Sequence, residues 1–143
     1  MAVVDKSVLI ERTPAQIFEL VDRVEDYPLF LPWCGGVELH ERSGNRTVAT
    51  LHINYHGLKS HFSTENEKDP PHWMRLRLKD GPLKHLDGHW KFIPLGDTAC
   101  KIEFKLHYEF SSKLLEKALG PVFNHIANTF VESFVKRAHQ CYD

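Results

Sequence analysis

The sequence predicts an α+β fold in which a curved antiparallel sheet of six to seven strands wraps around a long C-terminal helix, with one or two short helices after the first strand. Residues 111–143 carry apolar side chains at helical spacing, on a stripe wider than the seam of a two-helix coiled coil. Residues 37–110 instead alternate apolar and polar side chains in runs separated by turn residues. Because no second helix of similar length is present, the apolar stripe must pack against the sheet.

Length and composition are those of a single globular domain, which we place at residues 1–143. The net charge of −1 gives no overall attraction to nucleic acid or anionic membranes, so any such partner needs a local patch. The three cysteines are widely spaced and form no CxxC, a pattern typical of free thiols in a reducing compartment. The first residues lack the features of a signal peptide and no apolar run reaches membrane-spanning length, so we expect a cytoplasmic protein.

The N-terminal part predicts a strand, a short helix and a compact apolar loop. Residues 3–12 mix apolar and polar side chains as an edge or first strand would. Thr13 is a favourable N-cap and Pro14 a favourable first helical residue, so we expect a helix from Pro14 to about Arg23. Residues 26–36 contain two prolines and end in a Gly-Gly pair, which prevents a long helix and ends the segment. The large apolar side chains of this loop either fill the core or frame a pocket.

Six runs with a period of two follow, and each is short enough to be one strand. The last run alternates most cleanly, with an apolar side and a charged side. Because the connections are short, successive strands should pair antiparallel. The expected strands are residues 37–42, 46–55, 58–67, 73–79, 86–94 and 100–110.

The C-terminal helix contains a proline at a position where helices usually distort. Pro121 has no N–H to donate to the carbonyl of Lys117 and its ring clashes with that carbonyl, so we expect a kink or a break near Gly120. A strongly curved sheet cannot lie flush against a straight helix along its whole length. A gap lined by the apolar sides of both should therefore remain, and clefts of this kind are common ligand sites.

Two motifs and the C-terminal helix together resemble a known family. Residues 27–34 read Y-P-x-F-L-P-W-C, and residues 80–95 read D-G-P-L-K-x-L-x-G-x-W-x-F-x-P-L. They resemble the coenzyme-Q-binding START-like family, whose bacterial members include the ribosome-association toxin and whose wider group is labelled polyketide cyclase/dehydrase. The resemblance covers nearly the whole chain. It implies a helix-grip fold with a hydrophobic tunnel under the C-terminal helix, and either quinone or lipid binding or an action on the joining of ribosomal subunits.

The resemblance implies that ubiquinone or a similar isoprenoid or lipid is bound between sheet and helix, in support of respiratory quinone function, and that no cofactor is required. Burial alone would hold an apolar tail there. Core packing is the alternative role for every candidate. For Trp33 and Trp90 the sequence does not decide between core packing and contact with the ligand. The candidate ligand-binding residues are apolar or aromatic and come from the Pro-rich loop, the strands and the helix: Phe30, Trp33, Leu51, Ile53, Tyr55, Phe62, Leu76, Trp90, Phe92, Phe104, Leu106, Leu119, Phe123, Ile126 and Phe130.

The sequence predicts neither a catalytic residue nor a metal site. His85 and His89 are four residues apart, but they flank Gly88 in an expected strand, where this spacing does not bring side chains together. Cys34 precedes a Gly-Gly pair, yet no base that would activate its thiol can be named. The sequence also lacks GxSxG, a phosphate-cradling loop and a dinucleotide fingerprint. We therefore expect a binding protein rather than an enzyme.

The alternative role, contact with the large ribosomal subunit, rests on a group of basic residues. If the strands at 73–79, 86–94 and 100–110 are neighbours, their outer faces bring together cations that could contact RNA phosphates. Glu103 and Glu109 share this face and no exposed aromatic side chains are interleaved for base stacking, so a solvated outer face is the plain alternative. The six cations are Arg75, Arg77, Lys79, Lys91, Lys101 and Lys105.

A third expected partner is a membrane surface. The apolar tip of the loop from Phe30 to Trp33 could dip transiently into a bilayer or guard the opening of the tunnel. Membrane contact of this kind would place the protein at the periphery of the inner membrane rather than free in the cytoplasm.

Overall fold

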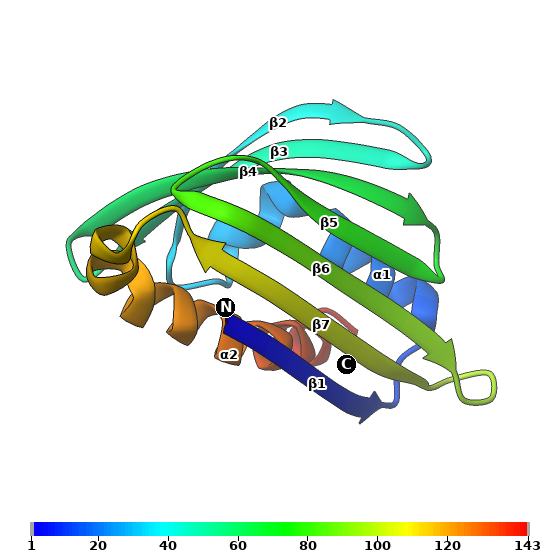
Figure 1. Cartoon of the computed structure of the whole chain (residues 1–143). Helices are drawn as coiled ribbons and strands as arrows, with labels where there is room; N and C mark the ends of the chain where they lie inside the picture. The colour runs from blue at the N-terminus through cyan, green and yellow to red at the C-terminus, as the bar shows by residue number, and fades with distance from the viewer. Residues whose placement is uncertain (1, 143) are drawn as a thin grey trace.

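In the computed structural model, which describes residues 2–142, seven antiparallel strands form one curved sheet around a long helix (Figure 1). This confirms the expected helix-grip architecture. The strand order is β1-β7-β6-β5-β4-β3-β2. The strands are β1 (Ala2–Ile10), β2 (Cys34–Arg42), β3 (Arg46–Tyr55), β4 (Leu58–Asp69), β5 (Trp73–Asp80), β6 (Leu83–Pro94) and β7 (Cys100–Phe110). The helices are α1 (Pro14–Asp22), the 3-10 helix η1 (Val24–Leu29) and α2 (Lys113–Tyr142).

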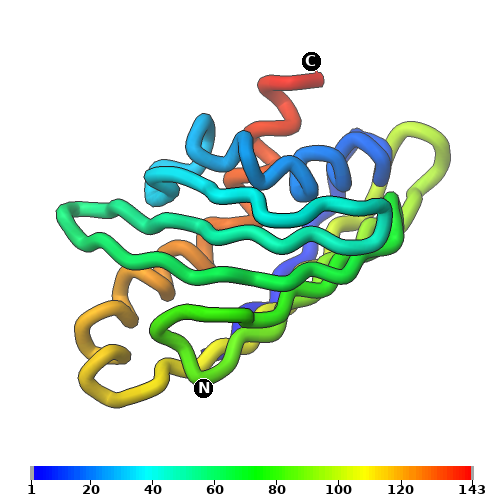
Figure 2. The backbone as a smooth tube through the Cα atoms, turned by 90° about the horizontal axis from the view of Figure 1, so that it is seen from above, coloured from blue at the N-terminus to red at the C-terminus, as the bar shows by residue number. Residues whose placement is uncertain are grey.

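The sheet is a six-strand meander, β2 to β7, to which the first strand is added at the far end. β1 pairs along its length with β7, from Ala2 opposite Tyr108 to Ile10 opposite Cys100. Seen from above, α2 runs obliquely beneath the strands, on the concave side of the sheet (Figure 2). The core therefore lies between the concave face and α2, where the gap was expected.

Helix α1 begins where its sequence predicts. The N–H of Gln16 donates to Thr13 Oγ1 at 3.2 Å and the N–H of Thr13 donates to Gln16 Oε1 at 2.9 Å, so two of the otherwise unpaired N–H groups are satisfied reciprocally. Pro14 occupies the first turn. The helix buries Ile17 and Phe18 among others and ends at Asp22, one residue earlier than expected.

The apolar segment after α1 differs from the expected loop at both ends. Its first part is the 3-10 helix η1, which includes Pro28 because the tight turn tolerates a proline that a long α-helix would not. Its last part belongs to β2, so Gly35 and Gly36 lie inside a strand instead of ending the segment. The pairing register shifts between Cys34 and Gly36, and a Cβ on Gly35 would lie 3.0 Å from the Cβ of Asn54, so the close strand approach favours glycine.

Helix α2 is continuous across Gly120 and Pro121, so a break there is wrong. One missing N–H bond does not end a helix whose other residues pack against a sheet on one side. Figures 1 and 2 show its first turns inclined to the remainder, as the expected kink would produce. Leu114 and Ala118, which the apolar spacing also placed on the stripe, are exposed on the first turns. Six of the seven buried residues lie on the predicted stripe and the seventh is Gly120; the six are Phe123, Ile126, Ala127, Val131, Phe134 and Ala138. Asp143, the expected last residue of the helix and of the domain, and Met1 lie outside the described residues.

Candidate ligand-binding cavity

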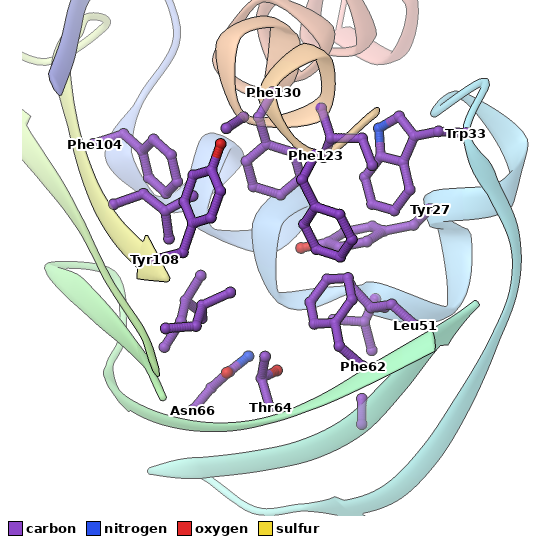
Figure 3. Close-up of a pocket in the computed structure, with 17 residues that line it drawn as sticks. Tyr27, Trp33, Leu51, Phe62, Thr64, Asn66, Phe104, Tyr108, Phe123 and Phe130 are labelled. Atoms are coloured by element: carbon purple, nitrogen blue, oxygen red, sulfur yellow. The ribbon is translucent and has the colours of Figure 1, made fainter. Parts of the chain in front are cut away.

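A cavity of about 70 Å³ lies between the concave face of the sheet and α2 (Figure 3). At about 15 Å³ each, this is room for about five water molecules. The walls come from η1, the segment before β2, the inner faces of β3 to β7, and α2. The lining residues are Val24, Tyr27, Trp33, Ala49, Leu51, Phe62, Thr64, Asn66, Leu76, Leu86, Phe104, Leu106, Tyr108, Phe123, Ile126, Ala127 and Phe130.

Most of the candidate residues from the sequence lie in these walls. All of them except Trp33, which precedes β2, lie on the inner side of a strand or on the buried stripe of α2, because period two and period 3.6 each identify a face. Their contact with a ligand stays a prediction. The nine lining residues among the candidates are Trp33, Leu51, Phe62, Leu76, Phe104, Leu106, Phe123, Ile126 and Phe130.

Trp90 and Phe92 do not reach the cavity but fill the core behind it. The Trp90 side chain is 1% exposed and its ring lies 4.5 Å from that of Phe104 and 5.4 Å from that of Phe134, centroid to centroid. Phe92 stacks on the other side of Trp90 and meets Phe18 of α1 edge-on at 5.7 Å. Trp90 therefore lies where the alternative role, core packing, would place it.

Four further candidates also lie away from the cavity wall. Phe30 packs edge-on against Phe134 at 5.2 Å, with the guanidinium of Arg137 over its ring at 5.2 Å. Tyr55 stacks on His125 of α2 at 5.3 Å. The remaining two are the buried Ile53 and the half-buried Leu119.

The sequence analysis missed eight lining residues, and one signal would have found two of them. Thr64 and Asn66 lie on β4 two and four residues after Phe62, so the period that places Phe62 inward places them inward too. They were overlooked because the candidates were chosen for apolar character. The other missed residues are Val24, Tyr27, Ala49, Leu86, Tyr108 and Ala127.

The two tyrosine hydroxyls in the wall are hydrogen-bonded within the protein. Tyr27 donates to the carbonyl of Val21 at 2.5 Å, and Tyr108 donates to Oδ1 of Asn124 on α2. Burial raises the pKa of both phenols, and the nearby Asp22 raises that of Tyr27 further. Both groups therefore keep their protons at neutral pH and hold η1 and α2 in place.

Three other polar groups of the wall make no hydrogen bond within residues 2–142. They are the indole Nε1 of Trp33, Oδ1 of Asn66 and the hydroxyl of Thr64. Thr64 and Asn66 lie side by side at the floor of the cavity in Figure 3, whereas the indole nitrogen of Trp33 is directed toward α2. The cavity is thus apolar except for one polar spot on β4.

A cluster of aromatic rings closes the cavity at the α2 side. Phe130 lies 5.0 Å from Phe134, 5.7 Å from Trp90 and 6.3 Å from Trp33, centroid to centroid. Tyr27 meets Phe134 edge-on at 5.4 Å. Edge-to-face contacts of this kind are favourable, so the closed arrangement is well packed and a larger occupant would have to displace rings.

The six cations of the outer face do not form a uniformly basic patch. Residues directly opposite each other on neighbouring strands share a face, and four of the cations stand opposite acids. Arg75 donates to both carboxylate oxygens of Asp87, and this hydrogen bonding lowers the pKa of Asp87. From the sequence, only Glu103 and Glu109 were expected to share this face with the cations. The acids opposite the cations are Asp5, Glu65, Glu67, Asp87 and Glu103.

One aromatic side chain accompanies these cations. Trp73 is half-buried, directly opposite Lys91, and meets the ring of His89 edge-on at 6.1 Å. Burial first, and then the charges of Lys91 and Arg75, lower the pKa of His89, so its ring is neutral at neutral pH. The outer face therefore carries one half-buried aromatic ring beside the cations.

The three cysteines differ in burial, and the side chains that could bind a metal are dispersed over residues 2–142. Cys34 and Cys100 are buried free thiols, and Cys141 is an exposed one. Burial raises the pKa of the Cys34 thiol, which makes it a poor nucleophile. Within residues 2–142, no three His, Cys, Asp or Glu side chains gather closely enough to hold a metal ion. Neither α1 nor α2, nor any other described helix, is both long and apolar enough to cross a bilayer.

Comparison with known proteins agrees with this geometry. Residues 10–135 match the family described as polyketide cyclase/dehydrase and lipid transport. The chain is 40% identical to the ribosome association toxin RatA of Vibrio cholerae over 142 residues, which cover 99% of both proteins. It is 28% identical to the mitochondrial coenzyme Q-binding protein COQ10 homolog B of Xenopus laevis, over 89% of this chain and 54% of that one. A START superfamily protein from Mycobacterium smegmatis has the same fold, with a TM-score of 0.75 at 19% identity, over 96% of this chain and 97% of that one.

Proposed function

Because the chain belongs to the polyketide cyclase/dehydrase and lipid transport family, we propose that it binds an apolar small molecule between its sheet and α2. The ligand is ubiquinone or a similar isoprenoid or lipid, and the binding supports respiratory quinone function. The cavity carries the proposal, since all of its lining residues except Thr64 and Asn66 are apolar or aromatic. The resemblance to a coenzyme Q-binding protein supports the choice of ligand.

The size of the cavity determines how such a ligand would bind. Pockets for drug-sized molecules measure about 300–1,000 Å³, whereas this closed cavity measures about 70 Å³. An isoprenoid tail therefore enters only when α2 or the segment from Phe30 to Trp33 moves outward. Burial at about 25 cal/mol per Å² lets a few isoprene units reach micromolar affinity after the ordering costs are subtracted.

Binding, in this proposal, is not accompanied by catalysis. The side chains that face the ligand space offer a hydroxyl, an amide, an indole and two phenols whose pKa values are raised by burial. None of these groups exchanges a proton near neutral pH, as a general acid or base would have to. The names of the curated relatives, a toxin and a binding protein, support the same conclusion.

The direct test is extraction of the purified protein. Protein isolated from its native, membrane-containing extract should release quinone or lipid into organic solvent, detectable by mass spectrometry. Phe123→Arg places a charge in the cavity wall and should abolish this signal, whereas Leu114→Arg, on an exposed part of the same helix, should preserve it. Wild-type protein without extractable ligand, or equal amounts in both variants, would contradict the proposal.

A second function, contact with the large ribosomal subunit, is favoured by a specific observation. The relative that is 40% identical over 99% of this chain is named a ribosome association toxin. The contact surface would be the outer face of β5 to β7, with Arg75, Arg77 and the half-buried ring of Trp73. The interleaved acids reduce its net charge, so the salt dependence of RNA binding should be modest.

Sedimentation separates this function from ligand binding. The wild-type chain should sediment with large ribosomal subunits at low salt and dissociate as salt is raised. The double change Arg75→Glu and Arg77→Glu should weaken sedimentation and leave the extracted ligand unchanged. The matched control is Lys113→Glu with Lys117→Glu, two exposed residues on α2 that lie outside this face. Equal losses for both pairs would exclude the outer face as the contact surface.

A further inference from the structure

The inner face of β4 changes from apolar to polar along its length. Phe62, Thr64, Asn66 and Lys68 alternate with outward-facing residues and all four are buried. Figure 3 shows Phe62, Thr64 and Asn66 on this strand at the edge of the hollow. A buried polar group costs free energy unless it has a hydrogen-bond partner. The partner of each polar group on this stripe therefore shows where one is missing.

The ammonium group of Lys68, at the far end of this stripe, has a partner, whereas the two polar groups at the cavity do not. Nζ of Lys68 lies 2.7 Å from Oδ1 of Asp22. Asn66 is 4% exposed, and its Nδ2 donates only to the sulfur of Met74 at 3.8 Å, while its Oδ1 has no partner. The Thr64 hydroxyl also lacks one among the described residues.

The contact with Met74 defines which end of the Asn66 amide is available. Turning the amide over would place its oxygen against the sulfur, so the donor stays at Met74 and the acceptor stays unpaired. Water fills such a space in the absence of a ligand, and the cavity has room for it. A ligand that displaces this water loses binding affinity unless its own polar groups replace the hydrogen bonds that the water made.

We propose that the cavity takes an amphipathic ligand whose headgroup carries a hydroxyl, as in a phenol, a hydroquinone or an alcohol, and that this hydroxyl binds at Thr64 and Asn66. The hydroxyl donates to Oδ1 of Asn66 and accepts from the hydroxyl of Thr64. A headgroup with carbonyls alone, such as an oxidised quinone, accepts from Thr64 but leaves Oδ1 of Asn66 unpaired. This inference rests on the proposed function, because it assumes that an apolar tail occupies the space under α2.

Three probes that differ at one position test it by calorimetry. The probes are 4-heptylphenol, which donates and accepts, 4-heptylanisole, which only accepts, and heptylbenzene, which does neither. The wild-type chain should bind the phenol about threefold to tenfold more tightly than the anisole, the usual net effect of one hydrogen bond, and heptylbenzene, which forms neither bond, should bind more weakly than both. Asn66→Leu should remove the preference for the phenol over the anisole, because the acceptor for the phenolic hydroxyl is gone. Asn128→Leu, on the exposed side of α2, is the matched control and should keep the preference.

The outcomes separate this inference from the function on which it rests. Equal affinity of wild type for all three probes, or a preference for the phenol over the anisole that survives Asn66→Leu, would overturn the headgroup site but leave apolar binding intact. Binding of none of them would overturn both. Thr64→Val keeps the shape of its side chain and should lower the affinities of the phenol and the anisole relative to that of heptylbenzene, which provides a second variant if Asn66→Leu does not fold.

Discussion

The buried ion pair between Lys68 and Asp22 should respond asymmetrically to removal of either partner. The Lys68 side chain is 3% exposed, whereas that of Asp22 is 22% exposed and also accepts a hydrogen bond from Thr47 at 3.4 Å. Asp22→Asn leaves an ammonium group without a counter-charge in the core, which should cost about 3 kcal/mol of unfolding free energy. Lys68→Met leaves a carboxylate that water can still reach, and should cost about 1 kcal/mol.

Urea unfolding measures this difference. With a slope of about 2 kcal/mol per M, Asp22→Asn should lower the midpoint by about 1.5 M and Lys68→Met by about 0.5 M. The double variant should resemble Lys68→Met, because the uncompensated ammonium is gone. Asp26→Asn, in the exposed pair with Arg23 at 2.9 Å, is the matched control and should cost at most about 1 kcal/mol. Equal losses from the two single changes, or a double variant equal to their sum, would refute the reasoning.

Three further predictions follow from burial and from the shifted pKa values. Phe134→Ala should lower the unfolding free energy by about 4 kcal/mol in urea titration, because the ring is fully buried among aromatic neighbours. Cys141 should react with a maleimide well before Cys100, which is buried and whose pKa is raised to about 11; equal rates in native protein would contradict this. His89, whose pKa burial lowers, should contribute stability above its unfolded pKa of about 6.5 that is lost as pH falls through the folded value, and His89→Phe should flatten that part of the stability curve.

Local chemistry explains which parts of the fold could be predicted from the sequence. Thr13 and Pro14 start a helix because their preferences depend only on neighbouring residues. Residues 100–110 form an alternating strand because one side faces the core and the other faces water. The start of β2 could not be predicted this way, since Gly35 is favoured by the close approach of Asn54, nineteen residues later in the chain.

The site could be predicted as a set of faces but not as a set of contacts. A period of two shows that Trp90 points inward, yet whether it borders the cavity or lies behind it depends on Phe104 and Phe130, which come from other elements. The same period places Asn66 inward, but this residue was missed because an amide is not expected in an apolar cavity wall. The acids opposite Arg75 and Arg77 depend on strand register, which a single strand does not reveal.

The pairing of β1 with β7 has a consequence for how the chain acquires its shape during synthesis. Ile10 pairs with Cys100, ninety residues later, so at about 5–20 residues per second the first strand waits roughly 5–18 s for its neighbour. The helix that covers the concave face is translated later still. A nascent chain stalled before residue 100 would expose the apolar face of an incomplete sheet whose last strand has no partner. Chaperones bind exposed apolar surface of this kind.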